Sequence, residues 1–207
     1  MKIFATEHRQ ARNESEVLGH LKRVQTDHSG ANFIRSVRDT FEVVGINGPH
    51  RCLIHDPLSL TLSDVRKLYG GKLPEEMLKP FVNYLLVALD FFHTEARVVH
   101  IDIQEGNVMI TTTDDSIWKE FEEKEWAEPS TRKIEENRVI YASRVLDIPD
   151  EPGHPVLCDF GDAQFGDMPF VGEVMPDLLP RTRDYTWNSM GREDRYMEPW
   201  IDDLGSV

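Results

Sequence analysis

Hydrophobic residues recur at helical spacing in two segments of the chain. Residues 74–95 carry one broad apolar stripe at three- and four-residue intervals, which predicts a long amphipathic helix at the core of the fold. The stripe consists of Leu78, Phe81, Val82, Leu85, Leu86, Leu89 and Phe92. Residues 8–24 show the same spacing and predict a second helix, and we expect a shorter one over residues 64–69.

Short apolar runs predict strands around these helices. The runs lie at residues 33–37, 41–44, 52–54, 98–99, 108–110 and 156–158. Asn47-Gly48 separates the second run from the third, and this dipeptide is typical of a tight turn between two strands. We therefore expect a strand, a turn and a strand between residues 41 and 54.

Residues 112–152 interrupt this pattern. Prolines and charged residues are frequent there, and several glutamates surround Trp118 and Trp126. We interpret the segment as a surface insertion with one acidic helix. Beyond Leu178 the chain shows neither a helical nor a strand period.

Composition narrows the class of protein. The chain has 207 residues, 40% of them hydrophobic and 29% charged, as in one globular domain of ordinary size. No apolar run is long enough to predict a membrane helix, and residues 1–7 lack the apolar core of a signal peptide. Cys52 and Cys158 lie in apolar runs, so we expect buried, reduced thiols in a cytosolic or nuclear protein. The net charge of −14 disfavours nucleic-acid binding and suits a basic partner.

Two motifs carry candidate chemistry. His100-Ile101-Asp102 is followed, after four residues, by Asn107, and apolar runs flank the whole segment. Asp159-Phe160-Gly161 follows the last apolar run. One carboxylate can accept the proton of a substrate hydroxyl, while an asparagine and a second aspartate can hold Mg²⁺ through hard oxygen ligands. These groups in this order are typical of phosphoryl transfer by protein kinases.

Residues 1–178 resemble the eukaryotic protein kinases, and most closely the serine/arginine-rich-protein kinases of fungal type. The resemblance implies an α+β fold that is part of the bilobal kinase domain. Residues 1–58 would be a remnant of the N-lobe with the hinge, and residues 59–178 the start of the C-lobe with the insertion at 112–152. By the same resemblance the glycine-rich loop and most of the C-lobe are absent, so we expect the domain to be incomplete at both ends and the isolated chain to be inactive and prone to aggregate.

The resemblance also assigns roles to residues of the catalytic end. Asp102 would be the catalytic base, and Asn107 and Asp159 would be the ligands of Mg²⁺. Lys2 would contact the phosphates of ATP, and Glu14 would be its ion-pair partner.

At the other end of the nucleotide, residues 52–58 resemble the last N-lobe strand and the hinge. His55 would be the gatekeeper beside the base. The carbonyl of Asp56 and the amide of Leu58 would face adenine, and Met109 would pack beneath the ring.

The chain departs from the family at two positions near the catalytic base. Gln104 replaces a lysine that meets the γ-phosphate, and an amide cannot neutralise charge. Ile101 replaces an arginine that normally pairs with a phosphorylated activation loop, and residues 160–178 contain no Ser, Thr or Tyr. We therefore expect any activity to be independent of activation-loop phosphorylation.

The genetic code offers an explanation for residues 179–207. Read one nucleotide forward from the codon of Leu179, with synonymous codons chosen freely, they are compatible with a hidden YRAPEIILGIPWDEKIDIWNLGxMIWDLF, where x is Leu or Ser. Some hidden residues allow no codon choice, and these also fit the family pattern: Met190 and Met197 each force Trp, and Trp187 and Trp200 each force Gly. We interpret residues 179–207 as an out-of-frame, poorly ordered tail.

Three functions remain open on the sequence. The resemblance favours a serine/threonine kinase that transfers the γ-phosphate of ATP, with Mg²⁺, to basic Arg/Ser-rich proteins in the cytoplasm or nucleus. A catalytically inactive pseudokinase or scaffold is the first alternative, and Gln104 favours it. A small-molecule phosphotransferase of the aminoglycoside or choline type is the second, since it shares the His-x-Asp…Asn loop, but it lacks the Ala-Pro-Glu of the hidden frame.

Overall fold

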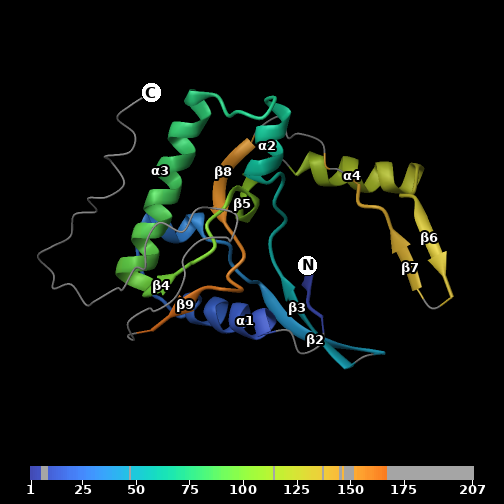
Figure 1. Ribbon diagram of the computed structural model, residues 1–207, viewed down its shortest axis with the longest axis horizontal. Coiled ribbons are helices and arrows are strands. Elements are labelled where there is room, and N and C mark those ends of the chain that lie inside the picture. The colour runs from blue at the N-terminus through green and yellow to red at the C-terminus, as the bar shows by residue number, and fades with distance from the viewer. Residues whose placement is uncertain are drawn as a thin grey trace, which may run out of the picture.

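The computed structural model describes residues 1–5, 9–46, 48–113, 115–136, 138–144, 146 and 152–166. These residues form a mixed α+β structure of helices and small antiparallel sheets (Figure 1). The proposed out-of-frame tail at residues 179–207 lies outside the described residues.

A three-stranded antiparallel sheet forms near the N-terminus in the order β1-β3-β2. It contains β1 (Lys2–Ile3), β2 (Asp39–Gly45) and β3 (Gly48–Ile54). Phe41 is opposite Cys52, and Gly45 is opposite Gly48 at the end of the hairpin. Gly48 has φ 115°, a conformation that residues with a Cβ rarely adopt. The predicted strands at 41–44 and 52–54 are confirmed, and Asn47 of the predicted turn lies outside the described residues.

The strand predicted at residues 33–37 is wrong. Residues Ser29–Phe33 form a 3₁₀ turn, η1, and the chain then runs extended with a single bridge from Ile34 to Leu157. The Nδ1 atom of His28 accepts a hydrogen bond from the amide of Gly30 at 3.0 Å, which closes this turn. A Cβ at Gly30 would lie 2.2 Å from the carbonyl oxygen of Val87, so this close packing against the following long helix favours a turn over a strand.

The three predicted helices are confirmed. They are α1 (Arg9–Leu21), α2 (Leu62–Leu68) and α3 (Glu75–Phe91), and a π-helical turn, Phe92–Ala96, extends α3. Thr61 caps α2 by accepting a hydrogen bond from the amide of Asp64 at 3.1 Å.

The apolar stripe of α3 is wider than the face that is buried. Phe81 and Phe92 are buried, as predicted. Leu78, Val82 and Leu86 lie along one edge of the stripe and are between 44% and 48% exposed. The periodicity therefore predicts the helix correctly but overestimates how much of it belongs to the core.

Two further pairs of strands hold the middle of the chain together. Strand β4 (Val98–Val99) pairs with β9 (Gln164–Phe165), and β5 (Val108–Thr112) pairs with β8 (Pro152–Leu157). The runs predicted as strands at 98–99 and 108–110 are confirmed, and the run at 156–158 lies at the end of β8. Cys52 and Cys158 are both buried free thiols, as expected.

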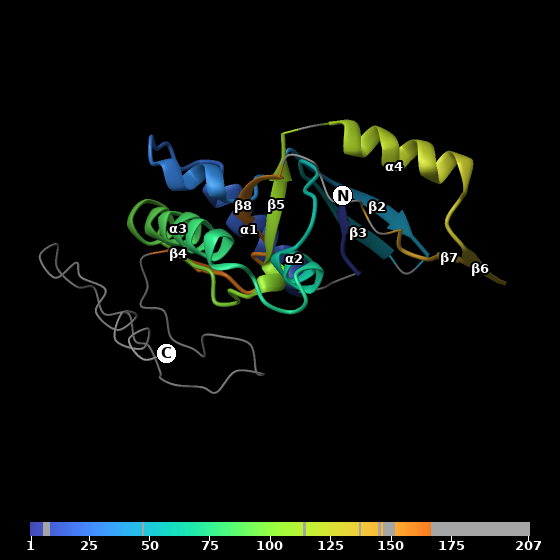
Figure 2. The same cartoon turned by 90° about the horizontal axis from the view of Figure 1, so that it is seen from above.

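The insertion projects from this body (Figures 1 and 2). It contains the predicted acidic helix, α4 (Ser116–Ala127), and a hairpin that the sequence analysis did not predict, formed by β6 (Arg132–Glu135) and β7 (Arg138–Tyr141). Arg144 donates to Glu125 at 2.7 Å, which ties the hairpin back to the helix. Throughout the described residues, no helix is long and apolar enough to span a membrane.

Candidate active site

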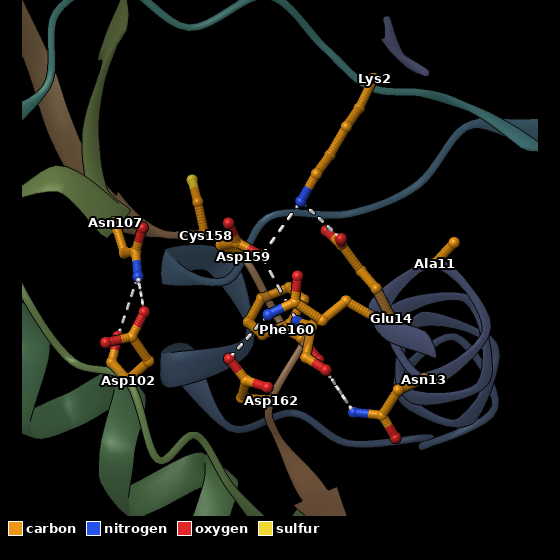
Figure 3. Close-up of polar contacts among 12 residues, drawn as sticks. Lys2, Ala11, Asn13, Glu14, Asp102, Asn107, Cys158, Asp159, Phe160 and Asp162 are labelled. Carbon is orange, nitrogen blue, oxygen red and sulfur yellow. Dashed lines mark hydrogen bonds and ion pairs between the residues drawn. The ribbon is translucent and has the colours of Figure 1, made fainter. Parts of the chain in front are cut away.

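Lys2 connects two carboxylates that are far apart in the sequence. Its Nζ atom lies 2.6 Å from Oε2 of Glu14 and 3.0 Å from Oδ1 of Asp159. Figure 3 shows the three side chains pointing toward one another from β1, from α1 and from the loop after β8. The Glu14 side chain is only 3% exposed, whereas that of Asp159 is 48% exposed and reaches solvent. The ammonium group of Lys2 thus connects the buried carboxylate of Glu14 to the accessible carboxylate of Asp159.

Burial and ion pairing compete at this cluster. Burial raises the pKa of Glu14 above its ordinary value, and the hydrogen bond from Lys2 only partly offsets this effect. Burial alone would lower the pKa of Lys2, but its contacts with Glu14 and Asp159 outweigh this, so the pKa of the ammonium is raised. Lys2 is therefore fully charged at neutral pH and able to neutralise an anion.

A second cluster forms in the loop after β4. The amide nitrogen of Asn107 donates to Oδ2 of Asp102 at 2.8 Å and to the backbone carbonyl of Asp102 at 2.9 Å. Gln104 donates to both carboxylate oxygens of Asp102, at 3.1 and 2.9 Å. The Asp102 carboxylate is thus held in one orientation by two neutral amides.

Main-chain contacts bring the two clusters together. His100 donates from Nε2 to the carbonyl of Cys158 at 3.0 Å, and the amide of Cys158 donates to the carbonyl of Asn107 at 2.8 Å. Ile101 and Asp159 adopt left-handed backbone conformations, with φ 72° and 64°, which is unusual for residues with a Cβ. Asp102 therefore follows one left-handed residue, and Asp159 is itself the other, close in sequence to the anchoring residues His100 and Cys158.

Phe160 fixes the segment that carries Asp159. Its ring is fully buried and makes edge-to-face contacts with Phe92 and His100, at ring-centroid distances of 5.8 and 5.4 Å. Burial lowers the pKa of His100, and its hydrogen bond to Cys158 only partly opposes this. His100 is therefore a neutral, packed residue that connects the loop after β4 to Cys158.

Helix α1 holds the same segment from the other side. The side-chain amide of Asn13 donates to the carbonyls of Gly161 and Ala163 at 2.9 and 2.8 Å, and Gln10 donates to Asp162 at 3.0 Å. The sequence analysis missed Asn13, although a polar residue next to Glu14 in an amphipathic helix is a usable signal. The helix that carries Glu14 therefore also positions Asp159.

The predicted hinge residues lie at the other end of this region. His55 is buried and donates from Nδ1 to the carbonyl of Ser36 at 2.8 Å, and burial lowers its pKa. Asp56 is exposed and pairs with Arg38, and Leu58 is partly buried. Met109 forms a bridge to Thr61. The structure places His55, Asp56 and Leu58 on the segment that follows β3, and Met109 on β5.

The sequence analysis also missed Arg35. This residue stands in the apolar run that was predicted to be a strand, and a single arginine in such a run is a signal in itself. Its Nη1 lies 4.0 Å from the sulfur of Met109. The predicted gatekeeper and ring-packing residues therefore have a cation beside them.

The oxygen atoms of this site fit a hard divalent cation. Asp159 uses Oδ1 for Lys2 and keeps a second carboxylate oxygen, while Asn107 uses its nitrogen for Asp102 and keeps its carbonyl oxygen. The described residues contain no group of three or more His, Cys, Asp or Glu side chains that could hold a metal alone. One carboxylate and one amide oxygen suit Mg²⁺, which usually takes few protein ligands and completes its shell with water and substrate phosphates.

Comparison with known proteins finds protein kinases among the relatives of this chain. Over 169 residues the chain is 38% identical to a serine/threonine protein kinase of Aspergillus fumigatus, covering 80% of this chain and 40% of that protein. This chain is a relative of the serine/threonine protein kinases. This chain is also 30% identical over 106 residues to protein kinase dsk1 of Schizosaccharomyces pombe, and 32% identical over 103 residues to human SRSF protein kinase 3.

These matches cover part of each protein. The alignment with dsk1 covers 51% of this chain and 20% of dsk1. The alignment with SRSF protein kinase 3 covers 46% of this chain and 18% of that kinase. The chain therefore spans 40% or less of the length of these three relatives. No protein-family model matches it.

Proposed function

We propose that the kinase domain to which this chain belongs binds ATP and transfers its γ-phosphate to a serine or threonine hydroxyl of a protein, while the isolated chain stays inactive as the sequence analysis expects. The observation that carries this proposal is the joining of Lys2, Glu14 and Asp159 in one ion-paired cluster, although 157 positions separate Lys2 from Asp159 in the sequence. The second cluster, around Asp102, is connected to the first through the backbone of Cys158. Together they offer a cation for phosphates, oxygen ligands for a metal and a carboxylate for a proton.

Each residue then has a distinct role. Lys2 neutralises phosphate charge, and Glu14 keeps its ammonium in place. Asp102 accepts the proton of the substrate hydroxyl as the oxygen attacks the γ-phosphorus. Asn107 and Asp159 would hold Mg²⁺, which supplies charge neutralisation on the phosphates when bound. The remaining catalysis is positioning of the two substrates in line.

The same proposal covers the architecture and the substrate. We assign residues 1–58 to the N-lobe side with its hinge and residues 59–178 to the C-lobe side of a bilobal kinase domain. The hinge carbonyl of Asp56, the hinge amide of Leu58 and the side chain of Met109 would bind adenine. The net charge of −14 supports a basic substrate, and SRSF protein kinase 3 is named for serine/arginine-rich factors, so Arg/Ser-rich proteins of the cytoplasm or nucleus are the proposed targets.

The test is nucleotide binding and transfer by the full 207-residue chain. We expect MgATP to bind to the wild type, and Lys2→Met and Asp159→Asn to weaken binding by tenfold or more. Lys79→Met is the matched control, because Lys79 is an exposed lysine on α3 that pairs with its helical neighbour Glu75. Transfer of labelled γ-phosphate to an Arg/Ser-repeat peptide would contradict the inactivity expected of the isolated chain, and any such transfer should be lost in Asp102→Asn. Equal binding by the wild type and Asp159→Asn would contradict the proposal.

One observation favours a second function, namely nucleotide binding without transfer. Gln104 occupies both oxygens of Asp102 with its own amide, and it places no charge near the substrate phosphates. A pseudokinase would show MgATP binding and no transfer, with transfer appearing in Gln104→Lys. Transfer by the wild type at a rate unaffected by Gln104→Lys would exclude this second function.

A further inference from the structure

Arg35 lies at the base end of the proposed nucleotide site. Its backbone amide donates to the carbonyl of Leu157 at 3.0 Å, which fixes the residue beside β8. Its guanidinium faces the sulfur atoms of Met109 and Cys158. Its charge also acts on His55, the predicted gatekeeper directly after β3, and its Nη1 lies 4.0 Å from the sulfur of Met109, the predicted ring-packing residue on β5.

The guanidinium lacks an adequate acceptor. Among the residues that the structure describes, its buried Nε has no hydrogen-bond partner, and the contact from Nη1 to Met109 reaches only a weak sulfur acceptor. Glu14, the carboxylate that interacts with it electrostatically, is already bonded to Lys2 at 2.6 Å. A partly buried cation without an oxygen or nitrogen acceptor costs free energy, and a ligand that supplies acceptors would recover it.

The surroundings define which part of a nucleotide would meet Arg35. Lys2 and Asp159 mark the phosphate end, and His55, Asp56 and Met109 mark the base end. A guanidinium has donors only, so it repels the amino group of adenine and pairs with a carbonyl oxygen and a ring nitrogen on one edge of a purine. Guanine and hypoxanthine present this pair of acceptors, and arginine binds it in a bidentate manner.

We propose that Arg35 is a specificity-determining residue that favours 6-oxopurine nucleotides, GTP and ITP, relative to ATP. The inference rests on the proposed function, because it requires that the site binds a nucleoside triphosphate. It adds that the nucleotide donor of this chain is not restricted to ATP, and it assigns the discrimination to one side chain outside the hinge.

The experiment compares dissociation constants of MgATP, MgGTP and MgITP on the full chain by calorimetry. The variants are Arg35→Met, which removes every donor but keeps an apolar stem, and Arg35→Lys, which keeps the charge but not the planar fork. Arg51→Met is the matched control, because Arg51 lies on β3 and pairs with Glu42 at 3.2 Å on the exposed surface. We compare the ratio of the ATP constant to the GTP constant within each protein, since this ratio does not depend on the fraction of folded chain.

We expect this ratio to fall about tenfold in Arg35→Met and by less in Arg35→Lys, with ITP following GTP and Arg51→Met unchanged. An unchanged ratio in Arg35→Met would overturn the inference and leave the proposed function intact. Tighter binding of all three nucleotides by the same factor would also overturn it, because Arg35 would then only obstruct the site. Absence of binding by the wild type would remove the proposed function itself, and the inference with it.

Discussion

The candidate site and the insertion are stabilised in opposite ways. Around the site, Phe92, His100 and Phe160 are each at most 1% exposed, and α1 and the β5–β8 pair enclose the catalytic loops. In the insertion, Trp126 is 81% exposed and Ile134 is 72% exposed, and ion pairs and hydrogen bonds at the surface connect the helix to the hairpin. Solvent screens such surface pairs, so they contribute little to overall stability.

The difference teaches which parts of the chain the site depends on. The residues proposed to act on a nucleotide all lie outside the insertion, on helices and strands of the main body or in the loops between them. The insertion occurs between β5 and β8, yet these strands pair with each other whatever the intervening segment does. We therefore expect changes in the insertion to be local and changes near Phe160 to be global.

The sharpest test of this contrast is the removal of one aromatic side chain from each region. Phe160→Ala should lower the free energy of unfolding by about 3–5 kcal/mol, because it leaves a cavity between Phe92 and His100. Trp126→Ala should change it by less than about 0.5 kcal/mol. Denaturant unfolding of both variants measures the two values, and similar losses would show that the insertion belongs to the same core.

A smaller effect is expected from the polar link between α1 and the Asp159 segment. Asn13→Ala leaves the carbonyls of Gly161 and Ala163 without their donor, which should cost about 1–3 kcal/mol of unfolding free energy. Ser15→Ala is the control on the same helix, because it removes only a hydrogen bond to Ala11 within α1. Equal effects of both substitutions in thermal unfolding would contradict the role given to Asn13.

Acidification should affect the buried region first. Burial lowers the pKa of His100 in the folded chain below the ordinary 6.5, so the unfolded chain takes up a proton that the folded chain resists. Stability is therefore complete above about pH 6.5 and is lost as the pH falls from there toward the lower folded pKa. His100→Gln keeps a donor for Cys158 but does not titrate, so its stability should decline less between pH 7 and 5. Identical pH profiles for the two proteins would rule out this contribution.

The insertion should respond only at lower pH, and locally. Hydrogen bonds from the side chain and backbone of Ser130, with help from Arg144, hold the pKa of Glu125 at about 2. Its contribution is present above the ordinary value of 4.5 and is lost as the pH falls toward 2. Glu125→Gln should speed hydrogen exchange at the Ser130 amide and leave the melting temperature unchanged, whereas Glu123→Gln should change neither the exchange rate nor the melting temperature. A lower melting temperature in Glu125→Gln would contradict the separation of the two regions.

Local patterns predicted most elements of the fold, and long-range contacts decided the rest. The stripe on α3 and the Asn47-Gly48 turn are properties of neighbouring residues, so they could be read from the sequence. The turn at residues 29–33 could not, because it depends on the close approach of Gly30 to Val87. The hairpin at residues 132–141 has no apolar alternation that is buried, which removes the signal for strands.

The residues of the candidate site also divide into those that local patterns predict and those that depend on long-range contacts. The motifs around Asp102 and Asp159 were visible because their residues are close in sequence, and the resemblance added Lys2 and Glu14. Asn13 and Arg35 were missed, because the local pattern marks them only as polar residues and their contacts come from segments far away in the sequence. The pairing of Gln104 with Asp102 was equally hidden, since only the loss of a charge at position 104 is visible without the structure.

The left-handed backbone at Ile101 and Asp159 limits how this protein can be improved. A residue with a Cβ in this conformation costs roughly 1–3 kcal/mol, and glycine would relieve the cost. A screen for heat resistance would therefore favour glycine at both positions. At position 159 this removes a carboxylate of the site outright, and at position 101 it loosens the turn that orients Asp102. Selection for stability would therefore favour glycine at positions 101 and 159, whereas selection for catalysis would disfavour it.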